Sequence, residues 1–138
     1  MSNERLFLDT AFVIGLLNWK DQYHGKAKEL FPRFRAAGEV WTTEAILVEI
    51  GNHLSSIQHR RTAIRFIQQC HANSRMRIVP ATTNLLNRAL DLYDSHKDKT
   101  WGLTDCISFV VMQDETLADA ITTDRHFQQA GFRALMQD

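Results

Sequence analysis

Residues 6–18 read LFLDTAFVIGLLN, and this stretch decides the fold. The apolar run at residues 6–8 predicts a short buried strand, and the apolar residues between positions 11 and 17 predict a short helix. Asp9 stands between them, as the first residue past the carboxyl end of the strand. Ligands of open parallel sheets bind at that edge. The stretch therefore predicts a strand that leads into a helix and presents a carboxylate where a ligand would bind.

The rest of the chain continues this alternation of strands and helices. Further strands are predicted at residues 39–41, 77–79, 119–122 and 132–135. Amphipathic helices are predicted between them, with N-caps at Thr42 or Thr43, at Thr82 or Thr83, and at Thr104. Strands that alternate with helices imply crossover connections and a parallel sheet. We therefore expect an α/β fold, with about five short parallel strands covered by helices on both faces.

Length and composition are typical of one compact domain over residues 1–138. Hydrophobic residues make up 44% of the chain, and 16 basic residues balance 16 acidic ones. This balance indicates no general nucleic-acid or membrane surface, so an anionic partner must be held locally. The apolar stretches are too short to cross a bilayer and no signal-peptide core is seen, so we expect a cytoplasmic protein. Cys70 and Cys106 lie in apolar helical patterns and are expected to be reduced core residues.

Four acidic residues are the candidates for chemistry: Asp9, Glu49, Asp105 and Asp124. Asp9 and Asp124 each follow a predicted strand, Asp105 falls in the first turn of a helix, and Glu49 in the second turn of another. Each also has a structural explanation, as a turn residue, a helix-dipole partner or a solvated side chain. However, Glu49 and Asp105 are flanked on both sides by apolar residues, which favours carboxylates that point inward or along a cleft.

Carboxylates gathered in one cleft would repel one another and raise one another's pKa, unless a cation neutralises them. All-oxygen ligation favours Mg²⁺ or Mn²⁺, because the sequence has no histidine and cysteine cluster with zinc spacing. A metal held by carboxylates can activate a bound water and neutralise charge on a phosphate. The acids therefore favour the hydrolysis of a phosphodiester bond.

Four segments in order carry a family resemblance: residues 6–18, the ILVEIGN stretch around Glu49, LTDCISFVVMQ at residues 103–113, and ITTDRHFQQAGF at residues 121–132. Together they resemble a PIN-domain protein of the VapC toxin type, nearly from end to end. The resemblance implies a single PIN-like nuclease domain and a metal-dependent ribonuclease, often paired with a cognate antitoxin and often a homodimer. One departure is Gly102, where we expect a serine that caps the helix.

The resemblance also assigns roles to individual residues. It implies that Asp9, Glu49, Asp105 and Asp124 hold the metal and carry catalysis. Thr123 matches a position where the family often has a hydroxyl that supports the metal or water, and Thr10 and Ser108 are further candidates for such support. His126 and His53 lie near these acids, and we interpret both as surface or partly buried imidazoles, because activation of water by a metal makes a histidine base unnecessary.

Positive groups for RNA phosphates are predicted at two places. Arg125 directly follows Asp124, and the densest run of arginines begins at Arg60 and Arg61 and continues through Arg65, Arg75 and Arg77. The alternative for the run is a solvated helix face whose arginines pair with nearby acids.

The leading hypothesis is a Mg²⁺- or Mn²⁺-dependent ribonuclease, the toxin of a type II toxin–antitoxin pair. By the family resemblance, its products carry a 5′ phosphate and a 3′ hydroxyl. The alternative is a non-catalytic PIN domain that binds RNA or protein and uses its acids only for architecture. A phosphohydrolase with Asp9 as nucleophile is disfavoured, because such sites usually have a second acid two residues later and Ala11 stands there.

Overall fold

A computed structural model describes residues 2–137, and its centre is one parallel sheet. The strands are β1 (Arg5–Leu8), β2 (Glu39–Thr43), β3 (Met76–Val79), β4 (Asp119–Ile121) and β5 (Arg133–Ala134). They form a five-stranded sheet in the order β3-β2-β1-β4-β5. β1 is central, since Phe7 is in register with Trp41 of β2 on one side and with Ala120 of β4 on the other. The predicted parallel sheet is confirmed.

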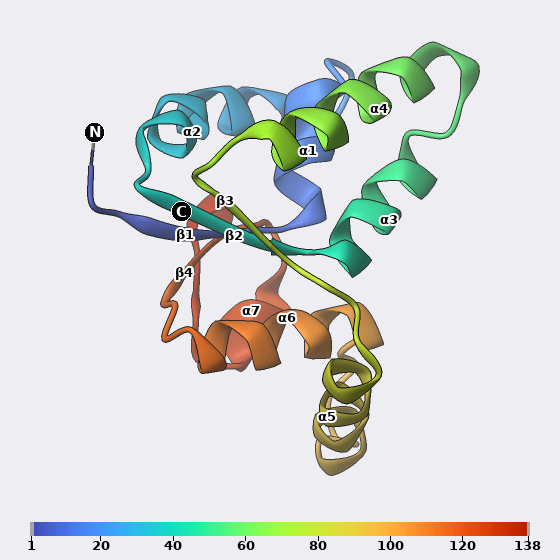
Figure 1. Cartoon of the computed structure of the whole chain (residues 1–138), viewed down its shortest axis with the longest axis vertical. Coiled ribbons are helices and arrows are strands. Elements are labelled where there is room, and N and C mark those ends of the chain that lie inside the picture. Colours follow the sequence, from blue (N-terminus) through green and yellow to red (C-terminus); the bar gives the residue numbers. More distant parts are fainter. Residues whose placement is uncertain (1, 138) are drawn as a thin grey trace.

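Helices cover both faces of this sheet, which makes three layers (Figure 1). Helices α1 to α4 lie on one face and α5 to α7 on the other. Their bounds are α1 (Thr10–Leu17), α2 (His24–Ala36), α3 (Glu44–His53), α4 (Ile57–Ala72), α5 (Thr83–Ser95), α6 (Leu103–Asp114) and α7 (Arg125–Gln129), with a final 3₁₀ turn η1 (Leu135–Gln137). The predicted α/β fold is confirmed. None of the helices in the described residues has the length and hydropathy needed to cross a membrane.

The core lies on both sides of β1 and along α6. Residues 6–8 are fully buried, as expected for a central parallel strand, whose two faces are both covered. Phe109 of α6 meets Phe127 of α7 edge-on, with 5.0 Å between ring centroids. Cys70 and Cys106 are free and buried, as predicted. Burial raises the pKa of the Cys70 thiol to about 11, so this side chain is a core residue without thiolate reactivity at neutral pH.

One predicted helix boundary is wrong, for a local reason. The N-cap of α6 is Gly102 and not Thr104, because the carboxylate of Asp105 reaches back and accepts the Gly102 N–H at 3.0 Å. Between α3, which ends at His53, and α4, the chain turns, and Ile57 at the start of α4 is 97% exposed. Thr43 and Thr82 do cap their helices, by accepting the N–H groups of Ile46 and Leu85.

The strand order places a switch in winding direction beside β1. The chain moves outward from β1 through β2 to β3, and then returns to the other side of β1 with β4 and β5. Ligand sites of open α/β sheets lie at such a switch, outside the carboxyl ends of the strands. The residues that follow β1 and β4 are therefore the ones best placed for chemistry.

Candidate active site

A cleft of about 480 Å³ opens at this switch, and all four predicted acids line it. Asp9 follows β1 and is the N-cap of α1, and Asp124 lies beyond β4 as the N-cap of α7. Glu49 projects from α3, and Asp105 from the first turn of α6. Four separate elements therefore bring negative side chains into one hollow, although the residues are up to 115 positions apart in the sequence.

Asp9 is the most buried of the four acids, with 8% of its surface exposed. Its Oδ2 accepts a hydrogen bond of 2.5 Å from the Thr122 hydroxyl. Burial raises the pKa of Asp9 to about 7, and the nearby charges of Asp105 and Glu49 act in the same direction, while the bond from Thr122 opposes them. Without a cation in the cleft, Asp9 therefore holds a proton up to near-neutral pH.

Glu49 is tied to the start of α1. The hydroxyl of Thr10, the first residue of that helix, donates to Glu49 Oε1. Thr10 thus stands where a supporting hydroxyl was predicted, between the end of β1 and the acid on α3. Because Thr10 directly follows Asp9, this bond also sets the position of α3 relative to the first acid.

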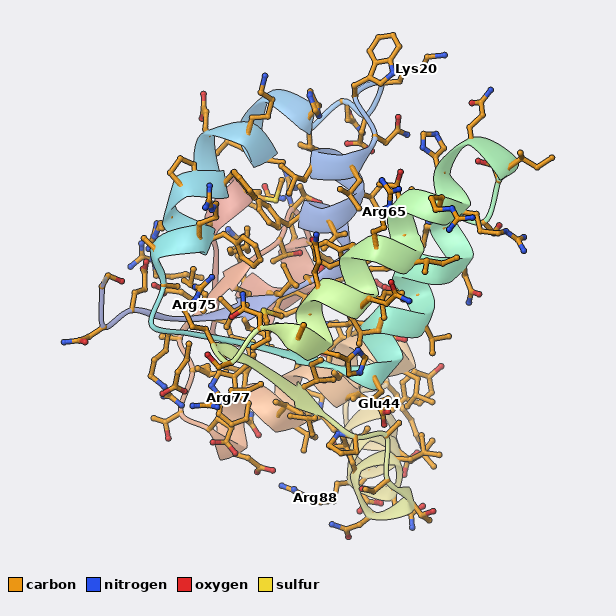
Figure 2. All side chains as sticks on the ribbon, turned by 45° about the horizontal axis from the view of Figure 1, so that its top comes forward. Lys20, Glu44, Arg65, Arg75, Arg77 and Arg88 are labelled. Carbon is orange, nitrogen blue, oxygen red and sulfur yellow. The ribbon has the colours of Figure 1, made fainter. Side chains whose placement is uncertain are left out.

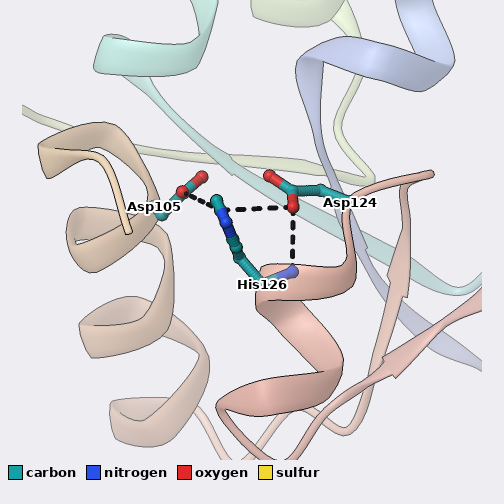
Figure 3. Close-up of side chains that lie close together, drawn as sticks. All are labelled: Asp105, Asp124 and His126. Carbon is teal, nitrogen blue, oxygen red and sulfur yellow. Dashed lines mark hydrogen bonds and ion pairs between the residues drawn. The ribbon is translucent and has the colours of Figure 1, made fainter. Parts of the chain in front are cut away.

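Asp105, Asp124 and His126 form the tightest part of the site (Figure 3). One potential ligand atom from each lies within 4.8 Å of the others. His126 Nδ1 is 2.9 Å from Asp105 Oδ2 and 3.3 Å from Asp124 Oδ1. Asp124 Oδ1 also accepts the backbone N–H of His126 at 2.8 Å, which caps α7. Asp9 and Glu49 line the same cleft but lie outside this tight group.

The electrostatics of Asp105 resemble those of Asp9. Burial raises the pKa of Asp105, and the charge of Asp124 adds to this, whereas hydrogen bonds from His126 and the Gly102 N–H oppose it. Both of these bonds end on Oδ2. No hydrogen bond between described residues reaches Oδ1 of Asp105. One carboxylate oxygen is therefore held by the protein, and the other is free for a ligand.

The hydroxyl that connects the acids is Thr122, which the sequence reasoning missed. Its Oγ1 donates to Asp9 and accepts the Asp124 N–H at 3.0 Å. Thr123, the predicted support, lines the cleft, and its carbonyl accepts the side-chain amide of Gln137. In an extended chain, side chains two residues apart point to the same side. The hydroxyl two residues before Asp124 was therefore the feature of the sequence that could have identified Thr122.

Ser108, a predicted supporting hydroxyl, does not line the acidic cleft. It is buried in α6 and does not line the cleft, and its hydroxyl donates to the carbonyl of Thr104 at 3.1 Å. One helical turn separates these two residues, so the serine completes its hydrogen bonding inside its own helix. The structure therefore does not bring Ser108 to the acids.

The predicted run of arginines is not one surface. Figure 2 shows Arg65 on α4 well apart from Arg75, which directly precedes β3, and Arg77, which lies in β3. Arg75 donates to the carbonyl of Ala37 at 2.7 Å, and Arg77 to that of Ser74 at 3.3 Å, so both are used in the fold.

The other three arginines lie outside the acidic cleft. Arg60 and Arg61 line a separate hollow on α4, together with Ile57 and Ile64. Arg125 is exposed at the start of α7, beside Asp124, but does not line the cleft. The cleft itself is therefore acidic. Of these three arginines, Arg125 is the one that is adjacent in sequence to an acid of the cleft.

Comparison with known proteins identifies the class. Residues 6–133 match the PIN domain family, so the chain belongs to that family. Within it, the chain is similar to the 23S rRNA-specific endonuclease VapC20 of Mycobacterium tuberculosis, in strains CDC 1551 / Oshkosh and ATCC 25618 / H37Rv. The identity is 27% over 134 residues, which cover 92% of this chain and 95% of the relative. The resemblance to VapC-type PIN-domain proteins, noted from the sequence, is confirmed.

Solved structures agree with this assignment. The crystal structure of M. tuberculosis VapC20, described as a sarcin–ricin loop cleaving toxin, superposes with a TM-score of 0.82 at 26% identity, over 93% of this chain and 96% of that one. VapBC2 from Rickettsia felis, solved with a DNA fragment from its promoter, gives a TM-score of 0.60 at 14% identity, over 91% of this chain and 92% of that one. The second likeness shows the fold alone.

Proposed function

We propose that this protein is a divalent-metal-dependent endoribonuclease of the VapC toxin type, which hydrolyses RNA phosphodiester bonds and leaves a 5′ phosphate and a 3′ hydroxyl. The observation that carries the proposal is the convergence of Asp9, Glu49, Asp105 and Asp124 on one cleft at the carboxyl edge of the sheet. In this proposal the four acids hold the metal and carry catalysis.

The donor set fits a hard cation. The four acids supply carboxylate oxygens only, which Mg²⁺ and Mn²⁺ prefer. Burial of Asp9 without a positive partner raises its pKa to about 7, and a bound cation would offset that cost. The ion would lower the pKa of a water and neutralise charge on the phosphate when bound. Thr122 and Thr10 would hold the carboxylates in place, and Thr123 is proposed as a further support at the cleft.

RNA is the substrate class that the comparisons favour. VapC20 is named as an endonuclease specific for 23S rRNA, and it aligns with this chain over almost its whole length. We therefore propose RNA as the substrate class of this chain. We do not propose the particular RNA, because the identity to VapC20 is 27%.

The shape of the cleft agrees with a nucleotide. Ala11, Ile14 and Tyr23 also line the hollow, and Tyr23 is 37% exposed. Aromatic and apolar side chains stack on or pack against bases that are not paired in a helix. The acids would therefore bind the scissile phosphate through the cation, while Tyr23 and its apolar neighbours in the lining would contact an adjacent base.

Phosphates away from the cut would be contacted by arginines. Arg125 begins the helix that Asp124 caps, so it is proposed to contact the backbone near the cleft. Arg60 and Arg61 are proposed to contact a more distant part of the RNA, because they line a different hollow. Such contacts raise affinity without reading the base sequence.

The toxin role adds partners to the proposal. The VapC resemblance implies a cognate antitoxin that covers the acidic cleft, and a homodimer. The cytoplasm, where RNA is available, is the compartment that this function requires. Coexpression with the product of a short neighbouring gene, followed by copurification and loss of cleavage, would test the antitoxin.

Cleavage of RNA in Mg²⁺ by Asp9→Asn and Asp105→Asn variants tests the enzymatic proposal. Both variants should lose at least about 100-fold in kcat, the scale seen when one strong transition-state contact is removed. Asp91→Asn, on the exposed side of α5, is the matched control and should cleave normally. Full activity in both test variants would refute the proposal. Intact folded protein that binds no Mn²⁺ in calorimetry would favour a non-catalytic binding module instead.

A further inference from the structure

His126 lies between two acids of the cleft and has no role yet in the proposed reaction. The ring comes from the first turn of α7, and the two acids come from α6 and from the N-cap of α7 (Figure 3). Its side chain is about one quarter exposed, so solvent only partly competes for its hydrogen bonds. The position of the ring therefore affects how Asp105 and Asp124 face each other.

The two ring nitrogens of His126 have different partners. Nδ1 lies 2.9 Å from Asp105 Oδ2, and Nε2 lies 3.2 Å from the hydroxyl of Thr100. An ionised carboxylate can only accept a hydrogen bond, so Nδ1 carries the hydrogen in the metal-bound site. In a neutral ring Nε2 then accepts from the Thr100 hydroxyl, and this bond orients the ring. The arrangement is a relay from Thr100 through His126 to Asp105.

Thr100 is itself held in place by its neighbour. Trp101 is 7% exposed, and its Nε1 donates to Gln129 Oε1 at 2.9 Å. Gln129 lies on α7, the helix that also carries His126. On the other side, the Trp101 ring stacks on His96 and meets Phe109 of α6 edge-on. The segment between α5 and α6 is thereby anchored to α7, and Thr100 is kept beside the imidazole.

We propose that His126 is a positioning residue, which turns Asp105 so that one carboxylate oxygen is held by the protein and the other faces the cation. Among the described residues the hydrogen bonds to Asp105 come from Gly102 and His126, and both end on Oδ2, which leaves Oδ1 available. The same ring nitrogen lies 3.3 Å from Asp124 Oδ1 and so limits the rotation of the second acid. This inference rests on the proposed metal-dependent function.

Carboxylate ligands of metals are commonly held by outer hydrogen bonds of this kind. Loss of such a partner typically lowers metal affinity or activity by about 10- to 100-fold. The expected defect is thus in the affinity for the ion, and an excess of the ion should restore part of it. A residue that only supported the fold would instead change the stability of the metal-free protein.

The experiment compares His126→Ala, His126→Asn and Thr100→Val, with His71→Ala at the end of α4 as the control. Calorimetric titration with Mn²⁺ should show about 10- to 100-fold weaker binding for His126→Ala. Asparagine keeps an N–H donor near the position of Nδ1, so His126→Asn should recover most of the affinity. Thr100→Val should show a smaller loss than His126→Ala, and the control should bind normally.

Cleavage assays across a range of Mn²⁺ concentrations give the second measurement. For His126→Ala, the concentration that gives half-maximal rate should rise, and kcat at saturating Mn²⁺ should recover most of its value. If urea unfolding shows that His126→Ala is unstable, the comparison of His126→Asn with Thr100→Val still tests the positioning role. The inference requires that Thr100→Val binds Mn²⁺ more weakly than His126→Asn.

Three results would overturn the inference. Wild-type Mn²⁺ affinity in His126→Ala would remove any positioning role. Equal loss in His126→Asn and His126→Ala would mean that the imidazole, and not its N–H bond, is required. Affinity in Thr100→Val equal to that in His126→Asn would break the relay. The proposed function has a separate test, since cleavage by Asp9→Asn would refute it whatever His126 does.

Discussion

The hydroxyl of Thr122 joins Asp9 to the backbone of Asp124. It donates to Asp9 Oδ2 at 2.5 Å and accepts the Asp124 N–H at 3.0 Å. Thr122 is fully buried and follows β4, which is hydrogen-bonded to β1. One side chain thereby fixes the distance between the first and the last acid of the cleft.

Replacement of Thr122 by valine should therefore affect both stability and the site. The change leaves a buried carboxyl group and a backbone N–H without their partner, at a cost of about 1 to 3 kcal/mol for a buried group left unpaired. Urea unfolding should show this loss in Thr122→Val, while Thr122→Ser, which keeps the hydroxyl, should stay close to wild type. Equal stability of all three proteins would show that the bonds contribute little.

The metal-free protein should become less stable as pH rises toward neutrality. The pKa of Asp9 is about 7 in the folded protein and 3.8 as a free side chain, so the folded state holds a proton that the unfolded state releases between these values. This contribution is fully present below about pH 4 and is lost as the pH rises through 7. A pKa difference of this size corresponds to on the order of 4 kcal/mol.

Asp9→Asn isolates this effect, because asparagine cannot ionise. Urea unfolding between pH 5 and pH 8, with chelator present, should show a shallower decline for this variant than for wild type, with Asp91→Asn as the unchanged control. Added Mn²⁺ should restore the stability of wild type at pH 8 and not that of Asp9→Asn. A wild-type stability that does not fall over this range would contradict the assignment of a raised pKa to Asp9.

Removal of the Tyr23 ring should weaken substrate binding more than catalysis. Loss of a base-stacking aromatic costs about 1 to 3 kcal/mol per base, so Tyr23→Ala should raise KM by roughly 5- to 150-fold with a smaller change in kcat. Tyr23→Phe keeps the ring and is the control. An RNA that lacks the base next to the cleavage site should bind both variants equally. If Tyr23→Ala discriminates against that RNA as strongly as wild type does, the ring is not the base contact.

Arginine substitutions should separate phosphate contacts from structural ones. Arg125→Gln, Arg60→Gln and Arg61→Gln should each lower RNA affinity for all sequences alike and reduce the salt dependence of binding by about one charge. Arg88→Gln, on α5, is the control, since its guanidinium is paired with Asp114. Binding titrations from low to moderate salt give the slopes. An unchanged slope in Arg60→Gln and Arg61→Gln would restrict the RNA path to the acidic cleft.

Local patterns predicted the order of strands and helices but not all of their limits. The run at residues 6–8 and the caps at Thr43 and Thr82 depend on neighbours in sequence, and they were predicted correctly. The start of α6 was missed because its N-cap, Gly102, has no side chain, and the carboxylate that accepts the Gly102 N–H comes from Asp105, three residues later. Ile57 at the start of α4 is apolar but almost fully exposed, so hydrophobic patterning does not show this limit.

The four candidate acids could be identified from the sequence, because each follows a strand or lies in the first two turns of a helix among apolar neighbours. The residues that hydrogen-bond to these acids could not be identified in this way. Thr122 and His126 act through hydrogen bonds to Asp9 and Asp105, which are 113 and 21 positions away. Ser108 is close to Asp105 in sequence, but its hydroxyl donates within its own helix to the carbonyl of Thr104.

The α/β alternation and the four acidic candidates could be identified from the amino-acid sequence, because hydrophobic periodicity and capping act over a few residues. Tertiary structure alone decided that β4 lies beside β1, which brings Asp124 to Asp9 through Thr122. The tertiary structure also buries Asp9, and this burial is the main cause of its raised pKa. The physical reason is that sheet pairing and desolvation depend on which distant segments pack together, and no short stretch of the chain contains that information.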